Sequence, residues 1–172
     1  DGFGGISGID YDPHSALWYL VSDDRSGQAP PRFFSAAMRF DAQRVESVSL
    51  KASYHIPAAA MDSESIRIAT KNRALLLAGE GDATHGVGPW LKRISFSGAL
   101  LQEIPLPPQL RDALNAGPRP NRSFEGLTFD SEQRHFWIGL ESPLLQDGPP
   151  NDEQRAADVR LTQLSLEGRM LA

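Results

Sequence analysis

The stretch SGIDYDPHSALWYLVSD (residues 7–23) recurs in altered form at two later places, and this repetition decides the fold. The related stretches are ESIRIATKNRALLLAGE (64–80) and EGLTFDSEQRHFWIGLE (125–141), at offsets of 57 and 61 residues. Each copy holds an alternating apolar run, then a more continuously apolar run, and ends on an acid. Alternation is typical of a strand packed on one face, and a continuous run of a strand buried on both faces. The chain is therefore an internal repeat of paired strands.

Two further apolar segments extend each copy of the repeat. The third segments align at Met38, Ile94 and Leu164. The fourth segments open at Val45, Leu101 and Leu171. Four short strands in each copy of 57 to 61 residues are typical of a propeller blade. We expect an all-β fold, a β-propeller segment forming a single domain over residues 1–172, with three four-stranded blades at about 1–57, 58–118 and 119–172.

Three blades do not close a ring, because propellers contain roughly four to eight. We favour the interpretation that the sequence is a fragment of a longer protein; the alternative is self-association of two copies. Within the segment we expect one helical stretch at 108–115 and one long loop at 142–157. That loop is an insertion in the third blade, and we expect it at one mouth of the ring.

Composition excludes several classes of function. The 172 residues carry a net charge of −5, so no field attracts nucleic acid, and no run of eighteen apolar residues predicts a membrane span. The absence of cysteine excludes disulfides, thiolate zinc sites and cysteine nucleophiles. The four histidines show no zinc-hydrolase spacing, and no Gly-x-Ser-x-Gly sequence supports a serine esterase.

Three segments resemble a known family: GGISGIDYDPHSALWYLVSDDR (4–25), NRSFEGLTFDSEQRHFWIGLES (121–142) and SPLLQDG (142–148). They are similar to the phytase-like propeller domain described as the esterase-like activity of phytase family. The resemblance implies a six- or seven-bladed ring, a periplasmic or secreted location and hydrolysis of small-molecule esters or phosphoesters. One departure is Asp62-Ser63-Glu64-Ser65, where the family commonly has Asp-Pro-Glu-Gly.

Acids recur at two columns of the repeat. Glu64 and Glu125 begin the first strand where the first copy has Ser7, and an acid ends the second strand in every copy. Equivalent positions of successive blades gather around one channel, and clustered carboxylates suit Ca²⁺ or another hard divalent ion. We therefore expect a Ca²⁺ site built from a set of acids: Asp23, Asp24, Glu64, Glu80 and Glu141.

The remaining chemistry would come from residues near these motifs. Glu125 and His85 are the candidate catalytic groups, since a carboxylate and an imidazole can both transfer protons. The candidate substrate-binding cations are Arg25, Lys71, Arg119 and Arg122. The expected function is metal-dependent hydrolysis of an ester or phosphoester.

Structural explanations of the same residues stay open. Repeated acids in propellers also accept hydrogen bonds from backbone N–H groups at turns, Asp23-Asp24 is also typical of a solvated turn, and a histidine such as His85 is often simply exposed. The alternative function is a non-catalytic propeller that binds a protein, glycan or small ligand.

Overall fold

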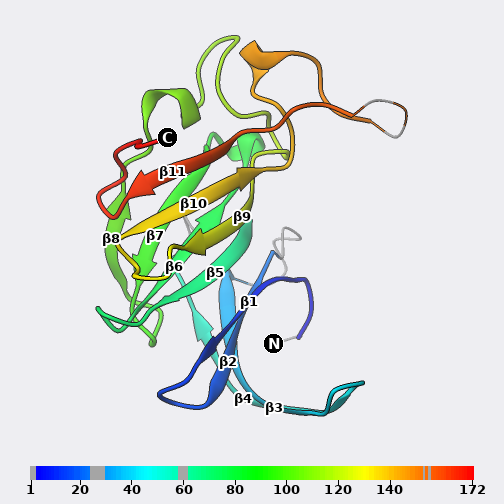
Figure 1. Ribbon diagram of the computed structural model, residues 1–172, viewed down its shortest axis with the longest axis vertical. Coiled ribbons are helices and arrows are strands. Elements are labelled where there is room, and N and C mark those ends of the chain that lie inside the picture. The colour runs from blue at the N-terminus through cyan, green and yellow to red at the C-terminus, as the bar shows by residue number, and fades with distance from the viewer. Residues whose placement is uncertain (1–2, 24–29, 58–61, 153, 155) are drawn as a thin grey trace.

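Three antiparallel sheets follow one another along the chain in this computed structural model (Figure 1). The structure describes residues 3–23, 30–57, 62–152, 154 and 156–172. The first sheet contains β1 (Ile6–Asp12), β2 (Leu17–Ser22), β3 (Arg32–Phe40) and β4 (Val45–His55). The second contains β5 (Ser63–Ala69), β6 (Ala74–Gly79), β7 (Trp90–Ile94) and β8 (Leu100–Ile104). The third contains β9 (Phe124–Phe129), β10 (His135–Leu140) and β11 (Leu161–Ser165). The all-β prediction is confirmed.

Each sheet is a meander in which consecutive strands pair, as in a propeller blade. The three aligned third segments lie in β3, β7 and β11. Beyond β11, Met170 forms an isolated bridge with Leu164, and the Leu171 amide donates to the Gln163 carbonyl at 2.9 Å. The segment predicted as a fourth strand therefore pairs with the edge of the third sheet.

The first strands of the three sheets lie side by side, with β1 against β5 and β5 against β9 (Figure 1). Serine hydroxyls join them: Ser7 Oγ donates to the Ser63 carbonyl at 2.6 Å, and Ser65 Oγ donates to the Glu125 carbonyl at 2.5 Å. The sheets are thus arranged as successive blades with their first strands innermost, which is the propeller arrangement that the repeat predicts.

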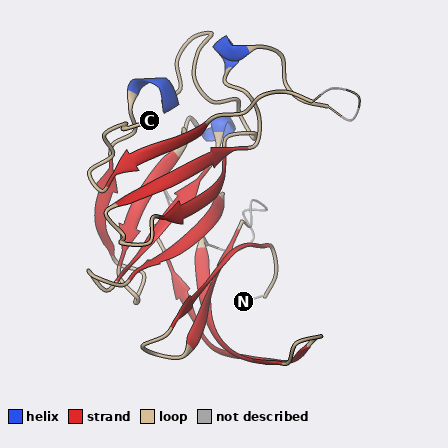
Figure 2. Cartoon of the chain, viewed as in Figure 1, coloured by secondary structure: helices blue, strands red, loops and turns tan. Residues whose placement is uncertain are grey.

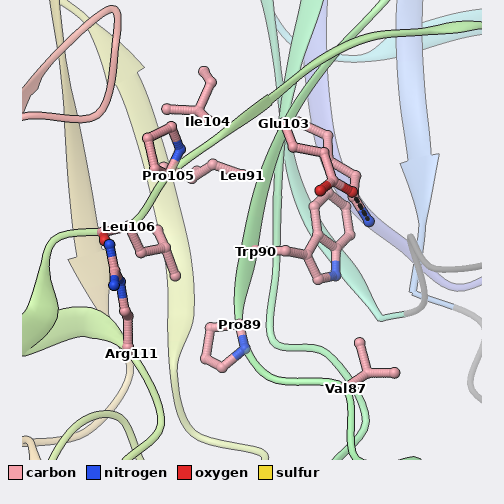
Figure 3. Close-up of a pocket in the computed structure, with 10 residues that line it drawn as sticks. Val87, Pro89, Trp90, Leu91, Glu103, Ile104, Pro105, Leu106 and Arg111 are labelled. Atoms are coloured by element: carbon pink, nitrogen blue, oxygen red, sulfur yellow. Dashed lines mark hydrogen bonds and ion pairs between the residues drawn. The ribbon is translucent and has the colours of Figure 1, made fainter.

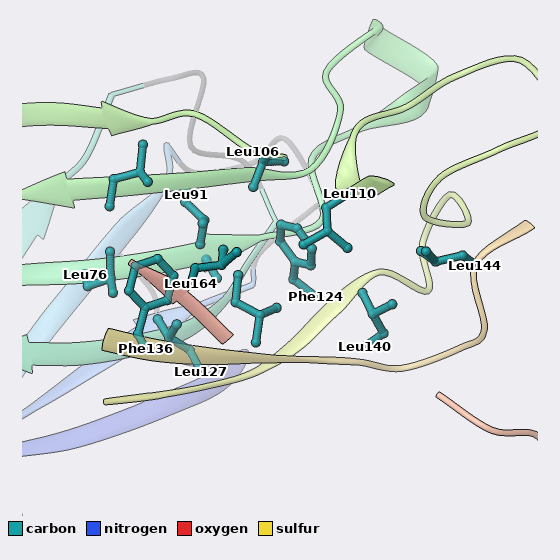
Figure 4. Packing of buried hydrophobic residues seen from close by; sticks show 13 residues of the cluster. Leu76, Leu91, Leu106, Leu110, Phe124, Leu127, Phe136, Leu140, Leu144 and Leu164 are labelled. Carbon is teal, nitrogen blue, oxygen red and sulfur yellow. The ribbon is translucent and has the colours of Figure 1, made fainter. Parts of the chain in front are cut away.

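The core lies between the sheets, and β6 contributes to both of its parts. Leu75 and Leu77 face the first sheet, whereas Leu76 and Ala78 face the third. All four are buried, which explains why this run is continuously apolar. Figure 4 shows the junction with the third sheet, where leucines from both sheets surround the ring of Phe136. Burial of each large side chain contributes about 1.5–3 kcal/mol.

Loops are divided unequally between the two ends of the sheets. Tight turns at 70–73 and 130–134 join the first and second strands at the end that we call the hairpin end. Long connections at 80–89, 105–123 and 141–160 gather at the opposite end, which we call the loop end. Figure 2 shows that the short helical turns lie outside the sheets, within these connections.

The helical prediction for 108–115 was wrong beyond its first turn. Only Pro108–Leu110 is helical, as a 3-10 turn. Leu110 is fully buried, but Leu114 is 93% exposed, so no second apolar contact holds another turn in place. The long loop was predicted correctly: it connects β10 to β11 at the loop end, and Arg160 pairs with Asp147 at 2.6 Å inside it.

Candidate functional site

A β-bulge occurs at the same repeat position of every inner strand. The register shifts place one unpaired extra residue in each: Ser7 in β1, Glu64 in β5 and Glu125 in β9. Bulges redirect side chains and are common beside active sites. The column of acids that the sequence singled out therefore coincides with a backbone irregularity at the loop end.

A second repeated feature holds the acids that follow β2, β6 and β10. The amide of each donates to the carbonyl of the residue that immediately precedes the first strand of the same sheet. The three bonds are Asp23 to Gly5 at 2.8 Å, Glu80 to Asp62 at 3.0 Å and Glu141 to Ser123 at 2.9 Å. The three acids are thus anchored at equivalent places, as the repeat predicts.

Four of the predicted acids come together at the loop end. Carboxylate oxygens of Asp62, Glu64 and Glu80 lie within 4.8 Å of one another, and the same limit holds for Glu80, Glu125 and Glu141. Glu80 belongs to both groups, which we call the acidic triads. The first triad is buried, with exposures of 4 to 6%, whereas Glu125 and Glu141 are exposed. Carboxylates this close repel one another unless a cation or protons lie between them.

Glu80 also makes a contact within the protein. Its Oε1 accepts a hydrogen bond from the amide of Ser123, which precedes β9 in the next sheet. This is the structural role that repeated acids were expected to share. This hydrogen bond fixes the carboxyl between the second and third sheets.

Asp23 does not join the triads. Its Oδ1 lies against Gly5 of its own sheet, where a Cβ would come within 2.4 Å of it. Aspartate has one methylene fewer than glutamate, so it contacts its own sheet, whereas Glu80 reaches the next one. Asp24 and Arg25 lie outside the described residues, so their predicted roles stay predictions.

Asp62 opens onto a cleft of about 300 Å³ beside the buried triad. The lining residues are Asp62, Gly81, Asp82, Ala83, Thr84, Pro120 and Asn121. None of them is basic, and two are acidic, so the cleft attracts cations. Asp62 and Asn121 have φ of 58° and 57°, a region that non-glycine residues seldom adopt outside turns. Such conformations concentrate at functional sites.

His85 ends the 3-10 turn Ala83–His85 above this cleft. Its Nδ1 lies 2.6 Å from Asp82 Oδ2, and the imidazole is largely exposed. Thr84 and His85 donate hydrogen bonds that lower the pKa of Asp82 to about 2, so this carboxylate stays ionised and orients the ring. His85 is next in sequence to Thr84 of the lining but is not itself part of it.

Three of the predicted substrate-binding cations, Arg119, Arg122 and Lys71, fall within the described residues. Arg119 donates to the carbonyls of Pro143 and Gly148, and Arg122 donates to that of Asn151 at 3.0 Å. Both side chains therefore hold the long loop. Lys71 is exposed in the turn after β5, at the hairpin end and away from the triads.

A larger groove, of about 560 Å³, lies on the outer strands of the second sheet (Figure 3). Lys92 is buried there, 3.7 Å from Glu103 and 4.8 Å from the centre of the Trp90 ring. Burial lowers the pKa of Lys92. None of the described residues predicted for the site lines this groove or the smaller cleft. The smaller cleft is nevertheless the one connected to the predicted acids, because Asp62 lines it and belongs to the buried triad.

Asp62 is the functional candidate that sequence reasoning missed. It was noticed only as part of the departure Asp62-Ser63-Glu64-Ser65. The sequence did contain a signal for Asp62: two acids, Asp62 and Glu64, stand two residues apart at the start of one first strand. The first copy of the repeat has the uncharged residues Gly5 and Ser7 at the same positions, so the two acids are not required by the repeat itself.

The comparisons with known proteins agree with the fold and the repeat. A family model described as phytase-like, esterase-like activity of phytase, matches residues 1–170. No curated protein matches the chain. Within the described residues, no helix is both long and apolar enough to cross a membrane.

Proposed function

The chain belongs to the phytase-like family described as esterase-like activity of phytase, and from this premise we propose that it is a divalent-cation-dependent hydrolase of small esters or phosphoesters. The observation that supports this most is the pair of acidic triads sharing Glu80. Carboxylates gathered this closely repel one another, and a divalent cation bound among them would relieve that repulsion.

Ca²⁺ fits the donor set, because it prefers several oxygen ligands and tolerates irregular geometry. We assign its ligands to the buried triad and Glu141, with Asp62 added to the residues predicted from the sequence. A bound divalent ion would offset part of the negative charge of these carboxylates and would polarise a phosphoryl or carbonyl oxygen. Another divalent metal stays open.

Two groups of this chain can move protons beside the triads. Glu125 is exposed and lies in the second triad, so its carboxylate can accept a proton from an attacking water. His85 is held through Nδ1, 2.6 Å from Asp82 Oδ2, which leaves its Nε2 for proton transfer. Since no basic residue lines the cleft, an anionic substrate would depend on the cation for binding.

The first experiment is thermal unfolding with and without Ca²⁺. A cation that binds only the folded chain, at a hundred times its dissociation constant, stabilises it by about 2.7 kcal/mol. No change in melting temperature with Ca²⁺, Mg²⁺ or Mn²⁺ would refute the metal site.

The second experiment is hydrolysis of p-nitrophenyl acetate and p-nitrophenyl phosphate. We expect Glu125→Gln to lower kcat by about a hundredfold or more, the usual contribution of a proton-transfer group, without changing the fold. Glu132→Gln is the matched control, because Glu132 is an exposed acid paired with Arg134 at the hairpin end. Equal rates in both variants would remove Glu125 from the mechanism.

The bond from the Ser123 amide to Glu80 favours a second candidate, a non-catalytic propeller whose acids organise loops for ligand binding. The two candidates differ in turnover. Stabilisation by Ca²⁺ with no hydrolysis of any ester or phosphoester would favour the binding function.

A periplasmic or secreted location is also part of the proposal, on the strength of the family. Fractionation of cells expressing the natural gene tests it, and recovery in the cytoplasm alone would contradict it.

A further inference from the structure

Ser123 carries a buried hydroxyl whose hydrogen-bonding capacity is unused. The residue is 1% exposed, and within the described residues its Oγ has no hydrogen-bond partner. A hydroxyl buried in this way loses its bonds to water without replacing them, which destabilises the folded state. Contact with an ion is one explanation for such a group in a folded protein.

The backbone of Ser123 places this hydroxyl beside the second acidic triad. The Ser123 amide donates to Glu80 Oε1, and its carbonyl accepts a hydrogen bond from the Glu141 amide at 2.9 Å. Both glutamates belong to that triad, and its third member, Glu125, follows two residues later in the chain. A serine Oγ lies within about 4 Å of its own amide nitrogen in every rotamer, so the Ser123 hydroxyl can contact an ion bound at Glu80.

The repeat assigns Ser123 to the position of a residue that already belongs to a triad. Ser123 and Asp62 each stand two residues before the bulged acid of their sheet. The carbonyl of each also accepts a hydrogen bond from the acid that follows the second strand of that sheet. Asp62 contributes its carboxylate to the buried triad. A side chain at this repeat position can therefore reach the clustered acids, and in the third sheet that side chain ends in a hydroxyl.

We propose that Ser123 Oγ is a further ligand of the divalent cation, on the side of the site where Glu80 and Glu141 lie. This inference rests on the proposed cation site and adds a neutral ligand to its carboxylates. A hydroxyl oxygen is a hard ligand, so it suits Ca²⁺. It raises the number of protein oxygens toward the roughly six to eight that Ca²⁺ takes, and it adds no negative charge to acids that already repel one another.

The first test is calorimetric titration of the chain with Ca²⁺. We expect Ser123→Ala to weaken Ca²⁺ binding about tenfold or more, the usual loss when a group that supports a metal site is removed. Without metal, this variant should unfold at the same or a higher urea concentration, because the hydroxyl that it loses has no partner within the described residues. Ser35→Ala is the matched control and should bind Ca²⁺ like the natural chain. Ser35 is also 1% exposed with an unpartnered Oγ, but it lies in β3 of the first sheet, whereas the triads come from the second and third.

The second test separates coordination from a structural role of Ser123. Thiolates select soft metal ions such as Cd²⁺, and the natural chain has no cysteine that would compete. We expect Ser123→Cys to bind Cd²⁺ at least about tenfold more tightly than the natural chain does and to show the charge-transfer absorption of a cadmium–thiolate bond. Ser35→Cys should show neither effect.

The outcomes distinguish failure of this ligand from failure of the cation site. Equal Ca²⁺ affinity in the natural chain and Ser123→Ala would overturn the role of Ser123 and leave the cation site in place. A cadmium complex of Ser123→Cys without thiolate absorption would also overturn it, because Ser123 would then act only through the fold. A natural chain that binds no divalent cation would refute the cation site itself, and this ligand with it.

Discussion

The hairpin end and the loop end of the sheets surround their buried acids in opposite ways. At the hairpin end, Asp12 is fully buried and Arg73 Nη1 donates to both of its oxygens, at 3.0 and 3.1 Å. Burial raises the pKa of Asp12, but hydrogen bonds from Arg73 and Ser15 outweigh it and keep the pKa below its ordinary value. At the loop end, the buried carboxylates have other carboxylates as neighbours. An acid compensated by a cation of the chain stabilises the fold, whereas acids gathered together are suited to an added cation.

Removal of the compensated acid should have the largest effect. Asp12→Ala loses the bonds from Arg73, Ser15 and the turn amides, and we expect the free energy of unfolding in urea to fall by about 3 kcal/mol. Asp41→Ala is the control, because Asp41 caps a similar turn but is exposed. A loss below about 1 kcal/mol for Asp12→Ala would mean that the pair does not hold the sheets together.

Removing a charge from the clustered acids at the loop end should have the opposite effect on stability. Glu64→Gln removes one charge from the buried triad, so without metal we expect the melting temperature to hold or rise. The same variant should lose most of the roughly 2.7 kcal/mol that saturating Ca²⁺ adds to the natural chain. Calorimetry with and without Ca²⁺ measures both effects. A variant that is still fully stabilised by Ca²⁺ would exclude Glu64 as a ligand.

Two glycines of one repeat column provide a steric comparison. A Cβ on Gly8 would come within 2.9 Å of the Ile66 amide nitrogen and 3.0 Å of the Ser65 Cα, both in the next sheet. Gly8→Ala should therefore destabilise the protein by about 1–3 kcal/mol. At Gly126 the nearest atoms are 3.8 Å away, so Gly126→Ala should cost less than about 0.5 kcal/mol. Equal urea midpoints for the two variants would contradict the close approach of β1 and β5.

The smallest of the expected effects is the pH dependence of the free energy of unfolding. It measures the contribution of the Asp12–Arg73 ion pair. Because the folded pKa of Asp12 is lowered, the ionised group stabilises the fold above 3.8, and this contribution is lost as the pH falls through the lower folded value. Arg73→Met removes the hydrogen bond and the positive charge that contribute to lowering that pKa, so the folded pKa of Asp12 is higher in the variant than in the natural chain. The stability difference between the two proteins should therefore narrow as the pH falls from the folded pKa of Asp12 in the variant to that in the natural chain, by at most about 1.4 kcal/mol per pH unit. Urea unfolding at several pH values measures it, with Arg44→Met as the exposed control.

Much of the fold was predictable because the repeat is carried by local patterns. The continuous run at 74–79 marks two-sided burial and is buried throughout in β6. The alternation in residues 7–12 correctly marks a strand, β1, but its apolar residues Ile9 and Tyr11 are exposed, whereas Gly8 and Asp12 are buried. The candidate site was predictable in part. Glu64, Glu80, Glu125 and Glu141 share repeat columns and come together. Arg119 and Arg122 looked equally suitable, but their guanidinium groups donate to loop carbonyls that lie far along the chain.

The sequence by itself determined the position of the first three strands of each copy and the columns in which acids stand, because these depend on periodicity along the chain. Only the tertiary structure decided which acids meet. One methylene separates Asp23, which contacts its own sheet, from Glu80, which reaches the next. A bulge aims Glu64 and Glu125, and the unusual φ of Asp62 places a fifth acid among them. Side-chain reach and backbone direction across a junction depend on distances between segments about 60 residues apart, and no local pattern encodes them.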